Sequence, residues 1–160
     1  MNSREAHIPV AAIEAASLRE DCLDAVRDLC IEVDRQIASH APRCRNRGLC
    51  CRFGQFGHRL YVTTLEASYY LAVHGPPPRI AEDVCPHAFD GRCHAREARP
   101  FGCRIFYCDP EASAWQGPLT ESCLARLRDL HTELDVPYVY ADWMAVLDML
   151  GTLRTKPDRL

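Results

Sequence analysis

Residues 85–108 read CPHAFDGRCHAREARPFGCRIFYC, so that four cysteines lie close together among Arg, Gly and Pro residues. Three further cysteines lie upstream, within residues 44–51. Buried structural cysteines behave as small hydrophobes and usually occur singly on apolar faces. The two groups therefore predict a metal or iron–sulfur site built from two segments of the chain. The candidate ligands are Cys44, Cys50, Cys51, Cys85, Cys93, Cys103 and Cys108.

The rest of the sequence indicates the class and location of the protein. Its 160 residues suit a single domain over residues 1–160, and 48% of them are apolar, enough for a hydrophobic core. The first apolar run, Ile8 to Ile13, is too short for a secretory signal, and no apolar stretch approaches the roughly 18 residues that span a membrane. We therefore expect a cytoplasmic protein with no membrane contact, where clustered cysteines bind metals more often than they form disulfides. In an exported protein the same ten cysteines would indicate a disulfide framework.

Amphipathic helices are predicted on both sides of the cysteine-rich region, which covers residues 44–109. Residues 15–40 repeat apolar side chains, Leu18 among them, at steps of three and four, and helices at 120–134 and 143–153 follow a similar pattern. Cys22, Cys30 and Cys123 fall on or beside the apolar faces, so we expect them in the core. The predicted fold is mainly α, a small domain whose N- and C-terminal helices pack around irregular, cysteine-rich metal-binding loops.

A helix is also predicted inside the cysteine-rich region. Thr63 and Glu66 have the spacing of a capping box, which predicts a helix that begins there and ends near His74. A short strand is predicted just before it, at residues 60–62, and residues 135–142 are predicted as a connector between the C-terminal helices.

Seven thiols exceed the four that one tetrahedral zinc ion or one cubane cluster needs. Three arrangements are open: one four-ligand site with spare thiols, two metals that share ligands, or one site plus redox-active cysteines. Cys50 and Cys51 are adjacent, and neighbouring side chains of an extended chain point to opposite faces, so both bind one metal only if the chain turns there. A tight-turn signal at residues 90–91 predicts that Cys85 and Cys93 approach each other.

Two arginines beside Cys103 suit a thiolate site, which carries net negative charge. Arg99 and Arg104 flank this cysteine, and Pro100 restricts the backbone between them. We expect at least one of the two guanidinium groups to be buried beside the metal, where its hydrogen bonds support the ligand loops. Because thiols are plentiful, we expect the nearby histidines to lie on the surface or around the metal rather than on it. They are His58, His74, His87 and His94, of which the last two lie within two residues of a candidate ligand.

The pair Cys50-Cys51, the dipeptide Cys85-Pro86 and the run Arg99-Pro100-x-x-Cys103-Arg104-x-x-x-Cys108 together form a recognisable pattern. It resembles the YkgJ-type cysteine-cluster proteins, a family of zinc- or iron-chelating domains, and flagellin lysine N-methylases carry a similar cluster. The resemblance covers about residues 44–109 and implies that the seven cysteines bind zinc or iron. One departure is Arg47, which stands where the family usually has an eighth cysteine.

Three functions fit these observations. The leading one is a cytosolic metal-binding protein that holds an iron–sulfur cluster, ahead of Zn²⁺, in a structural or redox role. The second is a modifying enzyme, methylase-like by the resemblance, although the chain has neither a Gly-rich nucleotide loop nor a CxxxCxxC radical-SAM signature. The third is a zinc-organised module that contacts protein or RNA through residues 41–60, which hold five arginines and no acidic residue. The net charge of −3 disfavours nucleic acid, and the sequence names no protein partner or substrate.

Overall fold

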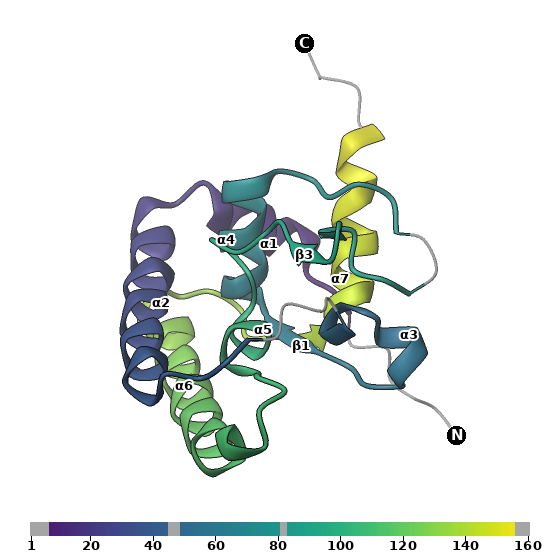
Figure 1. The fold of residues 1–160 in the computed structure, drawn as a ribbon. Coiled ribbons are helices and arrows are strands. Elements are labelled where there is room, and N and C mark those ends of the chain that lie inside the picture. The colour runs from purple at the N-terminus through teal and green to yellow at the C-terminus, as the bar shows by residue number, and fades with distance from the viewer. Residues whose placement is uncertain (1–6, 45–48, 81–82, 156–160) are drawn as a thin grey trace, which may run out of the picture.

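The computed structural model describes residues 7–44, 49–80 and 83–155, and the chain is mainly helical, with 62% helix and 9% strand (Figure 1). The prediction of a mainly α fold is confirmed. Within the described residues, no helix is long and apolar enough to cross a membrane. The helices are α1 (Val10–Ser17), α2 (Glu20–His40), α3 (Phe53–Phe56), α4 (Thr64–His74), α5 (Phe101–Ile105), α6 (Ser113–Glu133) and α7 (Trp143–Gly151). The strands are β1 (Tyr61–Thr63), β2 (Ala88–Phe89), β3 (Arg92–Cys93) and β4 (Tyr140–Asp142), and the short 3₁₀ helices are η1 (Leu49–Cys51), η2 (Pro110–Ala112) and η3 (Thr152–Thr155).

The N-terminal region forms two helices rather than the single helix predicted over residues 15–40. The chain turns at Leu18 and Arg19, between the end of α1 and the start of α2. Asp21 holds this turn, because its carboxylate accepts a hydrogen bond from the backbone N–H of Cys22 and forms an ion pair with Arg19. As a result Leu18, which the periodicity placed on the apolar face, is 86% exposed.

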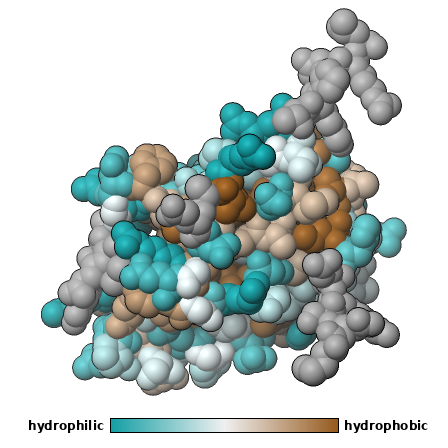
Figure 2. All heavy atoms as spheres, turned by 90° about the vertical axis from the view of Figure 1, so that its right-hand side faces the viewer, coloured by the Kyte–Doolittle hydropathy of each residue, from teal (hydrophilic) through white to brown (hydrophobic). Residues whose placement is uncertain are grey.

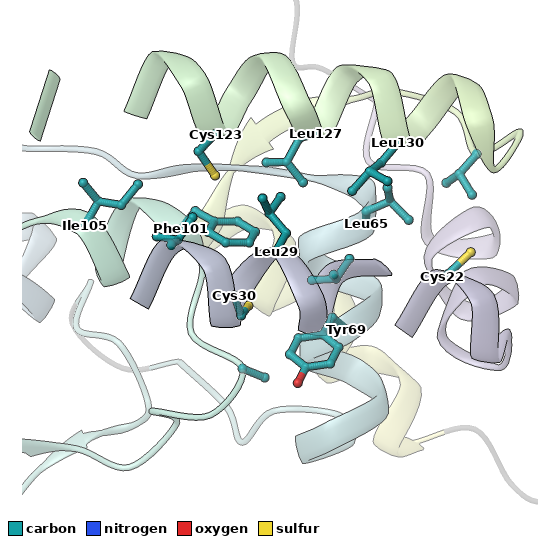
Figure 3. Close-up of a cluster of buried hydrophobic side chains, with 14 of the residues drawn as sticks. Cys22, Leu29, Cys30, Leu65, Tyr69, Phe101, Ile105, Cys123, Leu127 and Leu130 are labelled. Atoms are coloured by element: carbon teal, nitrogen blue, oxygen red, sulfur yellow. The ribbon is translucent and has the colours of Figure 1, made fainter. Parts of the chain in front are cut away.

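The first of two hydrophobic clusters lies between α2 and α6 and takes in side chains of α4 and α5 (Figure 3). Cys22, Cys30 and Cys123 all belong to it, so their prediction as core residues is confirmed. Burial raises the pKa of all three thiols, and that of Cys30 to about 11. These cysteines are small core side chains and lie apart from the cysteine-rich segments.

Helix α4 begins with the predicted capping box. The side chain of Thr63 accepts a hydrogen bond from the N–H of Glu66, and the Glu66 carboxylate accepts one from the N–H of Thr63 at 2.7 Å. The helix ends at His74, where Gly75 has a φ of 70° that favours glycine. Residues 64–70 are all buried, so α4 is a central element of the fold.

Strands β1 and β4 form an antiparallel pair beside the second hydrophobic cluster. The short strand predicted at residues 60–62 is confirmed with a shift of one residue, but β4 lies at the end of the segment 135–142 that we predicted as a connector. That prediction is wrong because three residues are too few to show a strand periodicity. Val62 lies opposite Ala141, and both are buried. Helices α4 and α7 begin directly after these strands, so the pairing fixes where both helices start.

The C-terminal helices differ at their ends from the predicted ones. Helix α6 begins at Ser113 rather than near residue 120, and it contains Pro118 in its second turn. The proline ring removes the backbone hydrogen bond that residue 118 would otherwise donate to the carbonyl of residue 114. Helix α7 buries Leu147 and Leu150, as predicted, and gives way to η3 after Gly151.

Candidate metal centre

A β-hairpin brings Cys93 next to the segment that begins at Cys85. Strands β2 and β3 pair in antiparallel register, with Ala88 opposite Cys93. The two turn residues, Asp90 and Gly91, have φ values of 52° and 67°, the conformation that a two-residue hairpin turn requires. The predicted tight turn is therefore confirmed, and the N–H of Ala88 also donates to the carbonyl of Cys85 at 2.9 Å.

Backbone pairing joins the two groups of cysteines. The chain turns through Cys50 and Cys51 in η1, and the next residue, Arg52, forms an antiparallel bridge with Val84. The N–H of Cys85 donates to the carbonyl of Cys51 at 3.0 Å. Because η1 turns the chain, the adjacent thiols of Cys50 and Cys51 both reach the same cavity.

Helix α5 carries Cys103 and begins directly after Pro100, a residue suited to a helix start. The neighbouring Gly102 packs against Leu60, and a Cβ atom at position 102 would overlap the Leu60 side chain. A glycine therefore allows α5 to approach the residues that precede β1.

Six of the seven candidate ligands line one cavity with a volume of about 620 Å³. These six are Cys50, Cys51, Cys85, Cys93, Cys103 and Cys108. The seventh candidate, Cys44, is exposed and does not line this cavity. Most of the other lining residues are apolar or aromatic, including Phe53, Phe56, Leu60, Ala95, Pro100, Phe106 and Trp143. The fold thus gathers thiols that are far apart in the sequence around an apolar space.

Neighbouring thiols and burial raise the pKa of three thiols of the cavity, those of Cys50, Cys51 and Cys103. A hydrogen bond with Cys51 and burial raise the pKa of Cys50. The bond with Cys50 lowers the pKa of Cys51, but a hydrogen bond with Cys85 and burial outweigh it and raise that pKa to about 12. Burial raises the pKa of Cys103, and the nearby thiols add to the effect. A cation that bound here would have to displace these protons.

Within the described residues, no three Cys, His, Asp or Glu side chains lie close enough together to hold one metal ion. Four thiolates bound to one zinc ion, each about 2.3 Å from it, would be only about 3.8 Å apart. An iron–sulfur cluster places several iron and sulfide atoms between its thiolates, which therefore lie further apart.

The two arginines beside Cys103 have different surroundings. Arg104 is buried, and its guanidinium donates to the Asp34 carboxylate of α2 at 2.6 Å and to the Glu97 carbonyl at 2.8 Å. It does not line the cavity. Arg99 is half-buried and lines the cavity, and its charge opposes the rise in the pKa of Cys103 that burial causes. One arginine therefore ties α5 to α2, while the other lies beside the thiols.

An aromatic group at the cavity wall, formed by His87, Trp143 and Tyr70, was not predicted from the sequence. His87 lines the cavity, and its Nε2 shares a hydrogen bond with the hydroxyl of Tyr70, which is fully buried in α4. Trp143 packs edge-on against Tyr70, with 5.0 Å between the ring centroids. His87 alone was indicated by its place two residues after Cys85. The other two residues carry no sequence signal, because they lie in helices that are distant along the chain.

The arginine-rich segment is only partly described. Arg43, Arg52 and Arg59 are exposed, and Arg45 and Arg47 lie outside the described residues. Arg59 forms an ion pair with Asp142 at 3.1 Å. Figure 2 shows the face that carries α3 and α7, where hydrophilic side chains alternate with apolar patches. The carboxylate of Asp142 therefore balances the charge of Arg59, one of the three described arginines of this segment.

Comparisons of the chain with protein-family models, with curated proteins and with solved structures found no match.

Proposed function

We propose that this chain is a cytoplasmic metal-binding protein that holds an iron–sulfur cluster through several of its cysteines, in a structural or redox role. The observation that carries the proposal is the gathering of six thiols around one cavity from segments that are distant in the sequence. All ten cysteines are free thiols, so these six are not committed to disulfides. The resemblance of the run from Arg99 to Cys108 to YkgJ-type cysteine-cluster proteins supports the proposal.

The chemistry of the donor set favours a thiolate-bound metal centre. Soft thiolate ligands select iron–sulfur clusters and zinc over harder cations. The sequence spacing favours the cluster, because the four residues between Cys103 and Cys108 are more than a zinc knuckle has and lie within the range that iron–sulfur proteins use. The residues that would hold the cluster are drawn from Cys50, Cys51, Cys85, Cys93, Cys103 and Cys108.

The surroundings of the thiols suit such a centre. When bound, an iron–sulfur cluster supplies one-electron transfer chemistry. The apolar wall includes Phe53 and Trp143, which are buried, and the polarity of the shell around a metal is one factor that sets its reduction potential. The guanidinium of Arg99 offsets part of the negative charge of the thiolates.

Anaerobic purification followed by analysis for iron, zinc and acid-labile sulfide tests the proposal. We expect iron and sulfide in equal amounts, with little zinc. Zinc without acid-labile sulfide would show that the site binds zinc and not an iron–sulfur cluster. A chain with neither metal after anaerobic purification and reconstitution with iron and sulfide would overturn the proposed function.

Cysteine variants locate the ligands. Cys103→Ser should lower the iron content and the thermal stability together, because the free energy of metal binding contributes to folding. Cys123→Ser is the matched control, since Cys123 is also a buried thiol with a raised pKa but belongs to the first hydrophobic cluster. Equal loss of iron from both variants would show that the effect comes from the core rather than from ligation.

A further inference from the structure

Cys51 and Cys85 face each other across the backbone pairing that joins the two cysteine groups. Arg52 forms an isolated antiparallel bridge with Val84, and Cys51, the last residue of η1, and Cys85 lie directly beside this bridge. The N–H of Cys85 donates to the carbonyl of Cys51 at 3.0 Å, and the Cys85 thiol is near enough to raise the pKa of Cys51. Both side chains line the cavity and are otherwise buried, with 8% and 9% of their surface exposed.

A backbone hydrogen bond between antiparallel segments holds two residues at a separation that a disulfide can span. Opposed residues in a hydrogen-bonded antiparallel pair have Cα atoms about 5.5 Å apart, within the range of about 4.4–6.8 Å that disulfides span. Cys50 also contacts Cys51, but the Cα atoms of adjacent residues are only about 3.8 Å apart across a trans peptide. That separation is shorter than the disulfide range, so closure between the two neighbours would distort the peptide.

We infer that Cys51 and Cys85 form a reversible disulfide in the metal-free chain, with glutathione disulfide as the oxidant. One cysteine, as its thiolate, attacks glutathione disulfide, which forms a mixed disulfide and releases one glutathione thiol. The other cysteine then attacks the protein sulfur of the mixed disulfide and releases the second glutathione. The pair loses two electrons and two protons, and one glutathione disulfide is reduced to two thiols.

The same disulfide would control the metal site. It removes Cys51 and Cys85 as donors, so oxidation of the pair and binding of the metal exclude each other if either cysteine is a ligand. This part of the inference rests on the proposed function. It makes metal loading depend on the ratio of oxidised to reduced glutathione.

Peptide mapping tests the pairing. The full-length chain, stripped of metal by a chelator under reducing conditions, is equilibrated with glutathione buffers, alkylated and digested with trypsin. Trypsin separates the peptide 48–52, which holds Cys50 and Cys51, from the peptide 80–92, which holds only Cys85. We expect two of the ten thiols to be lost and these two peptides to be linked. The link should persist in Cys50→Ser and disappear in Cys51→Ser.

Each outcome decides one part of the inference. Loss of the link in Cys50→Ser, a link from Cys85 to a different cysteine, or ten free thiols in an oxidising buffer would overturn the pairing. The wild-type chain and Cys50→Ser suffice for this decision even if Cys51→Ser does not fold. The chain loaded with iron and sulfide should form less of the disulfide than the metal-free chain does. If both form it equally and the loaded chain keeps its metal, then oxidation and metal binding do not exclude each other. A chain that binds no metal overturns the proposed function and the exclusion with it, while the linked peptide still decides the disulfide.

Discussion

The carboxylate of Glu66 accepts a hydrogen bond from the backbone N–H of Phe101 at 2.9 Å, across 35 residues of sequence. The other oxygen of the same carboxylate accepts from the N–H of Thr63, so one buried side chain serves the first turns of both α4 and α5. Phe101 lies two residues before Cys103. The capping residue of the central helix thus also positions the short helix that brings a candidate ligand to the cavity.

Glu66→Gln should lower the free energy of unfolding by about 1–3 kcal/mol at pH 7, because an amide has only one acceptor oxygen and leaves one buried N–H without a partner. Urea denaturation of the wild type and the variant measures the loss. Glu121→Gln, at an exposed position of α6, is the matched control and should change the free energy by less than about 0.5 kcal/mol. An equally small effect at both positions would show that the link from Glu66 to Phe101 does not stabilise the fold.

The stability difference between wild type and Glu66→Gln should also depend on pH. Burial raises the pKa of Glu66, although its hydrogen bonds to Thr63 and Phe101 oppose the rise. A raised pKa means that the folded chain binds this proton more tightly than the unfolded chain does. Its contribution to stability is therefore fully present below the unfolded pKa of about 4.3 and decreases as the pH rises through the folded pKa. Urea denaturation between pH 4 and pH 8 should show that the difference in free energy of unfolding between the wild type and Glu66→Gln decreases as the pH rises. A difference that increases with pH would contradict a raised pKa of Glu66.

Local signals in the sequence were sufficient where both partners lie within a few residues. Thr63 and Glu66 are three positions apart, and the hairpin turn is fixed by the dipeptide at residues 90–91, so both were predicted correctly. The link from Glu66 to Phe101 and the pairing of β1 with β4 have no such signal, because their partners meet only when the chain folds. The break between α1 and α2 was missed because the apolar periodicity runs through it.

The candidate site shows the same division between local and long-range information. Cysteines among Gly, Pro and Arg could be recognised as candidate ligands from residue type alone. Packing decides that six of them reach one cavity, while Cys44 does not. Packing also separates the two arginines, because Arg104 meets Asp34, a partner 70 residues away, while Arg99 lies on the cavity wall.

Gly91→Ala should destabilise the hairpin that carries Cys93. Its φ of 67° is unfavourable for alanine, and no neighbouring atom lies within 4 Å of the added Cβ, so the cost comes from the backbone alone. We expect a loss of about 1 kcal/mol in the free energy of unfolding. Gly117→Ala is the contrasting control, because this exposed glycine lies inside α6 with open space around it and should gain about 0.5–1 kcal/mol. Changes of the same sign at both positions would contradict this account.

Arg104→Lys should lower the free energy of unfolding by about 1–3 kcal/mol, because one ammonium group cannot reproduce both contacts of the buried guanidinium. Urea denaturation measures the loss. Arg27→Lys is the matched control, because Arg27 forms an exposed ion pair with Asp24 on α2, the helix that also carries Asp34. This substitution should change the free energy of unfolding by less than about 0.5 kcal/mol. A similar effect at the two positions would mean that burial of Arg104 adds nothing to its ion pair.

Arg99→Leu should weaken metal retention while affecting the stability of the metal-free fold less than Arg104→Leu does. Arg99 lines the cavity beside the thiols, and within the described residues its buried Nε atom has no hydrogen-bond partner. Its positive charge is therefore available to thiolates, whereas Arg104 is engaged by Asp34 and a carbonyl. Arg99→Lys should restore part of the retention, because it keeps the charge but not the planar fork.

Iron released to a chelator over time, measured beside urea denaturation of the metal-free chain, separates the two arginines. Arg96→Leu is the control for a lost positive charge near the site, because Arg96 is exposed and does not line the cavity. Release should be fastest from Arg99→Leu, slower from Arg99→Lys, and close to the wild-type rate from Arg96→Leu. Equal release from Arg99→Leu and Arg96→Leu would mean that overall charge, rather than the position of Arg99 on the cavity wall, holds the metal.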